Sequence, residues 1–340
     1  LPSRDGLLAS TLTPLGMAMW VRRRTGEPYH LPPHLTLLND RLVDVALGKI
    51  RKLAVFMPPR HGKSLAISCF FPTWYLGTFP DRKVIVTSYS HELCLQYTQL
   101  ARDTFRDWAP SLFGLQLSAT KAQAGNWGVE GHLGECYAGG LLGGLTGRGC
   151  SILIADDPQN GPEETESKIQ RDRSWRAFGA AATTRLTPGG SVVLVMTRWH
   201  QDDIAGRALE QGDWHVVNLP ALAEEEDALG RQPGEPLWPA ETLPDGRIVG
   251  FGVDELAERR KMLPSDYYWW AEYQQRPIPP GGAVFKQEWF RYFWQDANYY
   301  YLKHPLGDIS VQRQHCWRFS IADTASTTKT HSDYTAVGTF

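Results

Sequence analysis

Cysteine is scarce in this chain and is not arranged for cross-linking. The 340 residues include five cysteines, which are widely spaced and form no C-x-x-C pair. This pattern argues against a disulfide framework and against a cysteine-based zinc site. We therefore expect buried free thiols in a reducing cytoplasm.

Excess charge and long apolar runs are also missing. The formal net charge is −2, from 35 basic and 37 acidic residues, so the chain as a whole does not attract nucleic acid. DNA binding would need local basic patches, for which Arg22–Arg24 and Lys49–Lys52 are candidates, although such runs are more often solvated surface. No apolar run approaches a membrane span, and we expect no signal peptide and no membrane partner.

The composition is that of a globular protein. Hydrophobic residues make up 42% and charged residues 21% of the chain, which is typical of folded domains. The length suits two domains, or one large domain with an appendage. The chain begins at Leu1 and ends at Phe340 inside a strand-like run, so we expect it to be a piece of a longer protein.

A strand, a tight loop and a helix follow one another in the segment LAVFMPPRHGKSLAISCF. The apolar run Leu53–Met57 predicts a central parallel strand, which the next two prolines end because proline has no N–H for a β-ladder. Gly62, Lys63 and Ser64 then open an apolar helix over residues 65–71. Free N–H groups at a helix start bind anions, the lysine adds a charge, and the serine hydroxyl can ligate Mg²⁺.

We interpret this segment as a phosphate-binding loop of the Walker type, G-x-x-x-x-G-K-[ST]. The sequence departs from that pattern at Met57, where glycine is expected. An ordinary strand-turn-helix with a solvated Lys63 is the alternative. It does not explain why Arg60, His61 and Lys63 crowd one turn. The nucleotide-binding residues that the loop predicts are Pro59, Arg60, His61, Gly62, Lys63, Ser64 and Leu65.

Strand-like and helix-like segments alternate around this loop. Strands are predicted at 84–88, 150–157, 191–199 and 214–219, short strands or a hairpin within 127–149, and helices at 33–46, 65–71, 91–108, 163–182, 201–211 and 253–263. This alternation predicts an α/β fold of the P-loop nucleoside triphosphatase (RecA-like) class, with a mainly parallel sheet flanked by helices.

Polar residues end two of the predicted strands. Asp156 and Asp157 follow an apolar run, at the strand end where parallel sheets bind ligands. In phosphate-loop enzymes one such carboxylate holds Mg²⁺ and the next polarises the attacking water; we assign these roles to Asp156 and Asp157, although the second is usually a longer Glu. A helix cap is the alternative.

Thr197 ends the next strand and is placed to sense the terminal phosphate, while we expect His200 to be structural.

Arg148 lies between two glycines in the segment LTGRG. Flanking glycines let the side chain project without steric cost, and a guanidinium is suited to neutralising a transferring phosphoryl group. A surface arginine on a turn is the alternative.

Separately, residues 29–34 lie where many nucleoside triphosphatases hold adenine, although a capped turn fits equally well.

Four segments in this order, MPPRHGKS, ILIADDP, VMTRWHQDDIAGR and AEYQQRPIPPGGAVFKQEWF, together resemble the large terminase subunit of tailed bacteriophages and prophages. The resemblance extends from about Pro33 to Phe340. It implies an ATP- and Mg²⁺-dependent motor that moves double-stranded DNA through the portal into a procapsid, in the host bacterial cytoplasm. The implied partners are the portal, the small terminase subunit and further copies in a ring.

The resemblance also implies roles for single residues. Lys63 and Ser64 would bind phosphate and Mg²⁺, Asp156 the Mg²⁺, and Asp157 the attacking water. Arg148 matches an arginine that acts on a neighbouring subunit's ATP, and Thr197 falls in the coupling motif. Asp323 matches the first carboxylate of an RNase H-like nuclease that uses Mg²⁺ or Mn²⁺, and Asp333 is a weaker candidate. The later nuclease carboxylates are missing from this sequence, so we expect no DNA cleavage by it.

We therefore expect four parts: a helical segment at 1–50, an ATPase core at 51–220, a lid and linker at 221–280, and the start of the nuclease domain at 281–340. Two other functions are weighed against the motor. A superfamily-2-like DNA helicase or repair ATPase would need a second motor domain, which the residues after Gly281 do not resemble. The second alternative function is a non-catalytic scaffold that is gated by nucleotide.

Overall fold

The computed structural model describes residues 13–26, 31–143, 145, 147–243, 246–277, 293–303 and 307–317, and the backbone of 320–323 and 336–339. The chain divides into two compact units, Leu1–Ile278 and Pro279–Phe340, and each is described by itself. None of the helices in the described residues is long and apolar enough to cross a membrane.

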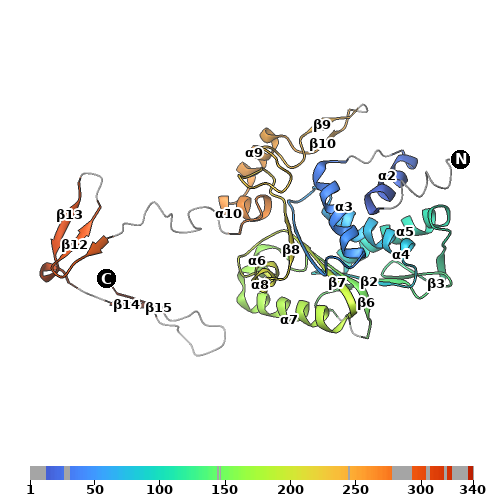
Figure 1. The fold of residues 1–340 in the computed structure, drawn as a ribbon, viewed down its shortest axis with the longest axis horizontal. Coiled ribbons are helices and arrows are strands. Elements are labelled where there is room, and N and C mark those ends of the chain that lie inside the picture. Colours follow the sequence, from blue (N-terminus) through green and yellow to red (C-terminus); the bar gives the residue numbers. More distant parts are fainter. Residues whose placement is uncertain are drawn as a thin grey trace. The chain divides into compact units, whose positions relative to one another are not determined.

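An eight-stranded sheet forms the centre of the first unit (Figure 1), with the order β3-β4-β5-β2-β6-β7-β1-β8. Its strands are β1 (Lys52–Phe56), β2 (Lys83–Ser88), β3 (Leu117–Gln123), β4 (Asn126–Val129), β5 (Glu135–Gly140), β6 (Cys150–Asp156), β7 (Leu186–Met196) and β8 (His215–Asn218). Strands β5, β2, β6, β7, β1 and β8, in this order in the sheet, run parallel to one another. Beyond β5, strands β4 and β3 extend the sheet by antiparallel pairing. The mainly parallel α/β fold predicted from the sequence is confirmed.

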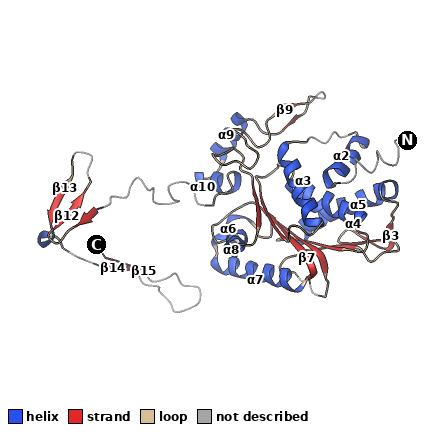
Figure 2. Ribbon diagram, viewed as in Figure 1, coloured by secondary structure: helices blue, strands red, loops and turns tan. Residues whose placement is uncertain are grey.

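Helices cover both faces of this sheet (Figure 2). One face packs against α2 (Pro14–Arg24), α3 (Pro33–Ala46), the π-helix η1 (Leu65–Phe70), α4 (Phe71–Thr78) and α5 (His91–Leu112). On the other face lie α6 (Gly161–Glu166), α7 (Lys168–Thr184) and α8 (Ile204–Glu210). Side chains of β1 therefore alternate between two cores: Leu53 and Val55 enter the first, and Ala54 and Phe56 the second. This double burial explains the unbroken apolar run.

Some predicted boundaries are wrong. The helix expected over 163–182 is interrupted at Ser167, which has extended backbone angles, and β7 begins at Leu186, before the apolar run. The helix after the phosphate loop does not end at residue 71: the π-helix η1 runs directly into α4, and Pro72 lies just after the point where the two meet. Strand β3 was not predicted; its sequence LSATKAQ is polar and mostly exposed.

Residues 221–277, which we call the 221–277 segment, have a small core of their own around Ala221, Leu256, Trp269 and Tyr273. The segment contains β9 (Glu241–Thr242), β10 (Ile248–Val249), α9 (Val253–Met262), α10 (Asp266–Tyr268) and the π-helix η2 (Trp269–Tyr273). Gln274 and Gln275 are 5% and 3% exposed, so the chain is still packed against its neighbours at these two residues.

In the second unit, β11 (Phe293–Gln295), β12 (Tyr299–Leu302) and β13 (Ile309–Gln312) form an antiparallel sheet, followed by the 3-10 helix η4 (Arg313–His315). Strand β14 (Ser320–Asp323) pairs antiparallel with β15 (Ala336–Thr339). Four cysteines are buried free thiols as predicted, but Cys316 is exposed; it follows η4 at the surface.

Candidate functional site

The phosphate loop connects the carboxyl end of β1 to η1. Arg60 and Gly62 have φ values of 67° and 86°, and this left-handed backbone makes the turn tight enough to present the following helix start. Met57 is fully buried in the core beneath the sheet. Its side chain therefore points away from the loop, which accounts for the departure from glycine at this position.

Lys63 is held at the centre of the site by two acceptors from other strand ends. Its Nζ donates to Thr197 Oγ1 at 2.6 Å and to Asp157 Oδ1 at 3.2 Å. Asp157 Oδ1 also accepts the Thr197 N–H at 3.0 Å. The lysine side chain is only 8% exposed, so these partners compensate for a buried positive charge. Asp157 itself has a φ of 43°, a strained backbone often found at functional sites.

Asp156 lies beside the start of the loop helix. Its Oδ1 accepts from Ser64 Oγ at 3.2 Å, and its Oδ2 accepts from Ser68 Oγ at 2.7 Å. Burial, and then the neighbouring charge of Asp157, raise the pKa of Asp156 well above its usual range, although Lys63 and the two hydroxyls act in the opposite direction. A bound cation would remove this penalty on the carboxylate.

The oxygen donors here fit Mg²⁺. Ser64 and Asp156 present a hydroxyl and a carboxylate, which are hard ligands of the kind that this ion prefers. Within the described part of the chain, no group of three or more His, Cys, Asp or Glu residues could hold a metal. Phosphate oxygens and water would therefore have to complete the coordination, as is usual for Mg²⁺ at nucleotide sites.

Two buried histidines support the loop from behind. The His34 Nε2–H donates to the carbonyl of His61 at 2.9 Å, and the His61 Nδ1–H donates to the carbonyl of Pro59 at 2.9 Å. The His61 ring stacks on Phe251 of the 221–277 segment, with ring centres 4.8 Å apart. Because His61 is 1% exposed, only its backbone can face a phosphate.

Three further residues border the site and were missed from the sequence. Ser68 lies four residues after Ser64, a helical spacing that could have revealed it. Tyr97 of α5 lies near Ser64 and is affected by the charges of both aspartates; burial raises its pKa above its ordinary value. Glu272 feels the charge of Lys63, and no local pattern marks it.

The loop after β7 is ordered by a buried ion pair. Arg198 Nε donates to Asp203 at 2.9 and 3.1 Å, and the Asp203 side chain caps α8 by accepting the Gly206 N–H at 2.7 Å. His200 Nδ1 accepts the Asp202 N–H at 2.9 Å. That contact agrees with the structural role expected for His200.

Arg148 is not part of this cluster. Its guanidinium lies 4.0 Å from the ring centre of Tyr137 in β5. Arg148 precedes the first residue of β6, whereas Asp156 is its last, and a seven-residue strand separates its ends by ~20 Å. The structure thus brings Lys63, Ser64, Asp156, Asp157 and Thr197 together and leaves Arg148 apart.

The other predicted positions contribute less. Pro59 offers its carbonyl to His61, and Leu65 packs against the core. In the basic patches, Lys49 and Lys52 are paired with Asp44 and Asp213 at 3.1 and 2.6 Å, which lowers their attraction for DNA. Of the predicted adenine segment, residues 29–30 lie outside the described residues. So does Asp333, while Asp323 is described only as the backbone end of β14.

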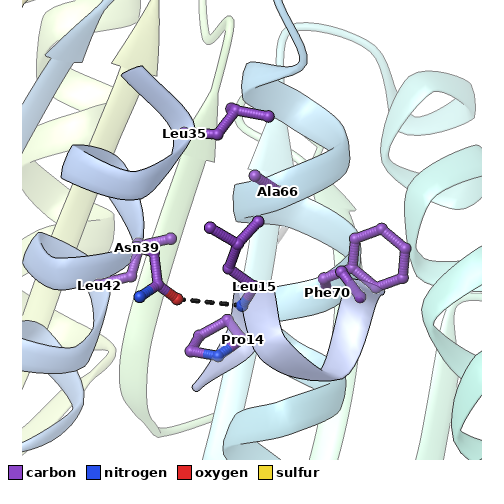
Figure 3. Close-up of a pocket in the computed structure, with 8 residues that line it drawn as sticks. Pro14, Leu15, Leu35, Asn39, Leu42, Ala66 and Phe70 are labelled. Carbon is purple, nitrogen blue, oxygen red and sulfur yellow. Dashed lines mark hydrogen bonds between the residues drawn. The ribbon is translucent and has the colours of Figure 1, made fainter. Parts of the chain in front are cut away.

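A small apolar hollow lies among α2, α3 and the loop helix (Figure 3). It is lined by Leu35, Leu42, Ala66 and Phe70, and the Leu15 N–H donates to Asn39 Oδ1 beside it at 3.0 Å. It contains none of the charged site residues, so it is a packing feature of the helical layer.

Residues 55–292 match the family model described as terminase large subunit, T4likevirus-type, N-terminal. The chain belongs to this family. The matched range contains the phosphate loop, both aspartates and Thr197. A comparison with curated protein sequences finds no match.

Solved structures of large terminases are among those similar to the chain. The large terminase of a thermophilic bacteriophage in complex with ADP is 8% identical, covering 81% of this chain and 68% of that one, with a TM-score of 0.39. The complex of the same terminase with ATP-gamma-S is 9% identical over the same shares, with a TM-score of 0.43. A mutant of the large terminase ATPase domain from a Thermus phage is 13% identical, covering 74% and 96%, with a TM-score of 0.41.

Proposed function

We propose that this chain is the ATP-hydrolysing part of a viral DNA-packaging motor, which drives double-stranded DNA through the portal into a procapsid in the host cytoplasm. The observation that supports this most is the convergence of Lys63, the Asp156–Asp157 pair and Thr197 from three separate strand ends, in a chain of the large terminase family. The small terminase subunit and further copies of the chain are the other partners that family membership suggests.

The roles follow from the contacts. Lys63 and the N–H groups of the loop, from Pro59 to Leu65, bind the phosphates of ATP. Ser64 and Asp156 hold Mg²⁺, which offsets the phosphate charge. Asp157 orients the attacking water through its second oxygen, because its Oδ1 is already held by Lys63 and the Thr197 N–H.

Thr197 links the site to the rest of the fold. Its Oγ1 accepts from Lys63, and the next residue, Arg198, forms the buried ion pair with Asp203 that caps α8. Loss of the terminal phosphate would release Lys63, and the resulting movement of Thr197 would be passed to α8 through these contacts.

Arg148 acts on the nucleotide of a neighbouring subunit in the assembled ring, since its own site is a strand length away. The 221–277 segment acts as the lid. Asp323 contributes to a metal-dependent nuclease site that requires further carboxylates.

The test is ATP turnover and nucleotide binding by the purified chain, with and without double-stranded DNA, portal and procapsid. We expect hydrolysis that rises when these partners are present. Lys63→Ala should weaken ATP binding about 100-fold, because a charge-assisted contact is worth up to ~3 kcal/mol. Lys49→Ala, which alters an exposed lysine paired with Asp44, is the matched control. A folded chain that binds no ATP would rule the proposal out.

A further inference from the structure

Asp157 has a backbone conformation that its place in the sequence does not favour. Its φ of 43° lies in the left-handed region, which is uncommon for a residue with a side chain. The next residue is Pro158, and a residue that precedes proline prefers an extended backbone. Contacts from other parts of the fold must therefore hold Asp157 in this conformation.

Hydrogen bonds to the backbone of Asp157 supply this restraint. The Asp157 N–H donates to the Val195 carbonyl of β7 at 2.8 Å, and the Asp157 carbonyl accepts the Tyr89 N–H at 3.1 Å. The same carbonyl accepts from Ser88 Oγ at 3.1 Å. Of these partners, only the Ser88 hydroxyl belongs to a side chain, so it is the contact that depends on the identity of a residue.

Ser88 is itself fixed within the sheet. It is the last residue of β2, the strand between β5 and β6, and it is 1% exposed. Its carbonyl accepts the Leu141 N–H at 2.8 Å, just after β5. A buried hydroxyl that lost its acceptor would find no water to replace it. The contact with Asp157 therefore joins the ends of β2 and β6 firmly.

The side chain of Asp157 is held in a different way. Its Oδ1 accepts from Lys63 and from the Thr197 N–H, and among the described residues no donor contacts its Oδ2. A phosphate bound at Lys63 would compete for the ammonium and weaken one of these two contacts. The backbone contacts from Ser88 and Tyr89 do not involve the lysine, so they persist when nucleotide is bound.

We propose that Ser88 is a positioning residue for ATP hydrolysis: its hydroxyl holds the backbone of Asp157, so that Oδ2 keeps its direction towards the attacking water after a phosphate has engaged Lys63. This inference rests on the proposed function, since it requires that Asp157 orients that water. The Ser88 hydroxyl donates to the Asp157 carbonyl and acts only through it. Its loss lets the carboxylate turn away and removes no group that binds nucleotide.

The test measures ATP turnover and the affinity for ATP-gamma-S, each with Mg²⁺, for the chain and for Ser88→Ala under the conditions that give the wild type its highest turnover. We expect kcat to fall about tenfold, or ~1.4 kcal/mol of activation free energy, and the affinity to change less than twofold. Ser88→Thr keeps the hydroxyl and should retain most of the turnover, because its neighbour in β5 is Gly140, which has no side chain. Ser90→Ala removes a hydroxyl that accepts the Leu93 N–H and is the matched control, with unchanged turnover.

Combining the variant with Asp157→Asn separates positioning from general destabilisation. If Ser88 acts through the Asp157 carboxylate, Ser88→Ala should lower kcat less than twofold in a chain that already carries Asp157→Asn, because the two changes affect one function. A structural role alone would lower kcat by the same factor in both backgrounds.

The outcomes are distinct. An unchanged kcat in folded Ser88→Ala overturns the inference, and so does an equal loss in the two backgrounds or a loss confined to nucleotide affinity. If Ser88→Ala does not fold, Ser88→Cys, whose thiol is a weak donor, decides the question by the same comparison. If the wild-type chain hydrolyses no ATP, the proposed function fails first. If the wild type is active and Ser88→Ala equals it, only the role of Ser88 fails.

Discussion

Lys63 Nζ lies 3.2 Å from Asp157 Oδ1, although the two residues are 94 positions apart in the sequence. Each side chain depends on the other: the lysine is 8% exposed and needs a counter-charge, and the aspartate is pinned at the end of β6 by that contact and the Thr197 N–H. A phosphate group at Lys63 would compete for this ion pair, which joins nucleotide binding to the position of Asp157.

Asp157→Asn should separate binding from turnover. The amide keeps an acceptor for Lys63 but removes the negative charge that orients water, so we expect ATP turnover to fall by about 10²–10³. Binding of ATP-gamma-S should change by less than about tenfold, since one ion pair is lost. Asp213→Asn, at an exposed ion pair with Lys52, is the control. Unchanged turnover in Asp157→Asn would show that another group orients the water.

Arg148→Ala should reduce turnover only where subunits assemble. An arginine finger is worth roughly 10³–10⁵ in rate, so we expect about a 10³-fold loss with portal present and unchanged nucleotide affinity. Mixing Arg148→Ala with Lys63→Ala subunits should restore part of the activity, because each supplies what the other lacks.

The matched control for the finger is Arg106→Ala, an exposed arginine paired with Asp103 and Asp107. A mixture that shows no rescue under conditions where rings form would contradict action on a neighbour. Full activity of Arg148→Ala alone would remove the residue from the mechanism.

Ser68→Ala should destabilise the fold as well as the site. Ser68 is fully buried and donates to Asp156 Oδ2 at 2.7 Å. Its loss leaves a buried carboxylate oxygen without a partner, which costs about 1–3 kcal/mol of unfolding free energy. Urea unfolding measures this, with exposed Ser111→Ala as control. Mg²⁺ with nucleotide should recover part of the loss. Equal stability of both variants would argue against the role of Ser68.

Acid should weaken the support of the phosphate loop. Burial lowers the pKa of His34 and of His61 from 6.5 to about 4. The unfolded chain takes up protons below pH 6.5 while the folded histidines stay neutral, so stability present above pH 6.5 is lost as the pH falls towards 4. Between pH 7 and 5 the loss is about 2 kcal/mol for each histidine.

Unfolding free energies of the wild-type chain and of His34→Gln, measured over this pH range, isolate the effect. The variant should lose about 2 kcal/mol less than the wild type, whatever its stability at pH 7. Parallel pH profiles for the two proteins would show that His34 titrates normally in the folded state.

The parts of the site that were predicted from sequence share a local signature. Lys63 and Ser64 open a helix directly after a strand, and Asp156, Asp157 and Thr197 end apolar runs. In a parallel sheet such ends lie on one edge, so the pattern predicts their convergence. The strand order placing β7 between β6 and β1 could not be derived this way, since periodicity does not specify which strands pair.

Other residues of the site had no such signature. The polar strand β3 and the buried Gln274 and Gln275 appear in the sequence as loop or linker, because their pairing and burial come from distant segments. Tyr97 and Glu272 join the site only when α5 and η2 pack against it.

The sequence by itself determined the α/β class, the phosphate loop and the strand-end acids, because these depend on hydrophobic periodicity and on residues adjacent in the chain. Only the tertiary structure decided that Arg148 lies away from its own loop, that His61 is covered by Phe251, and that the Gln275 side chain accepts the Arg198 N–H. These relations join segments that are far apart in the sequence, and the packing of helices and of the 221–277 segment on the sheet sets them.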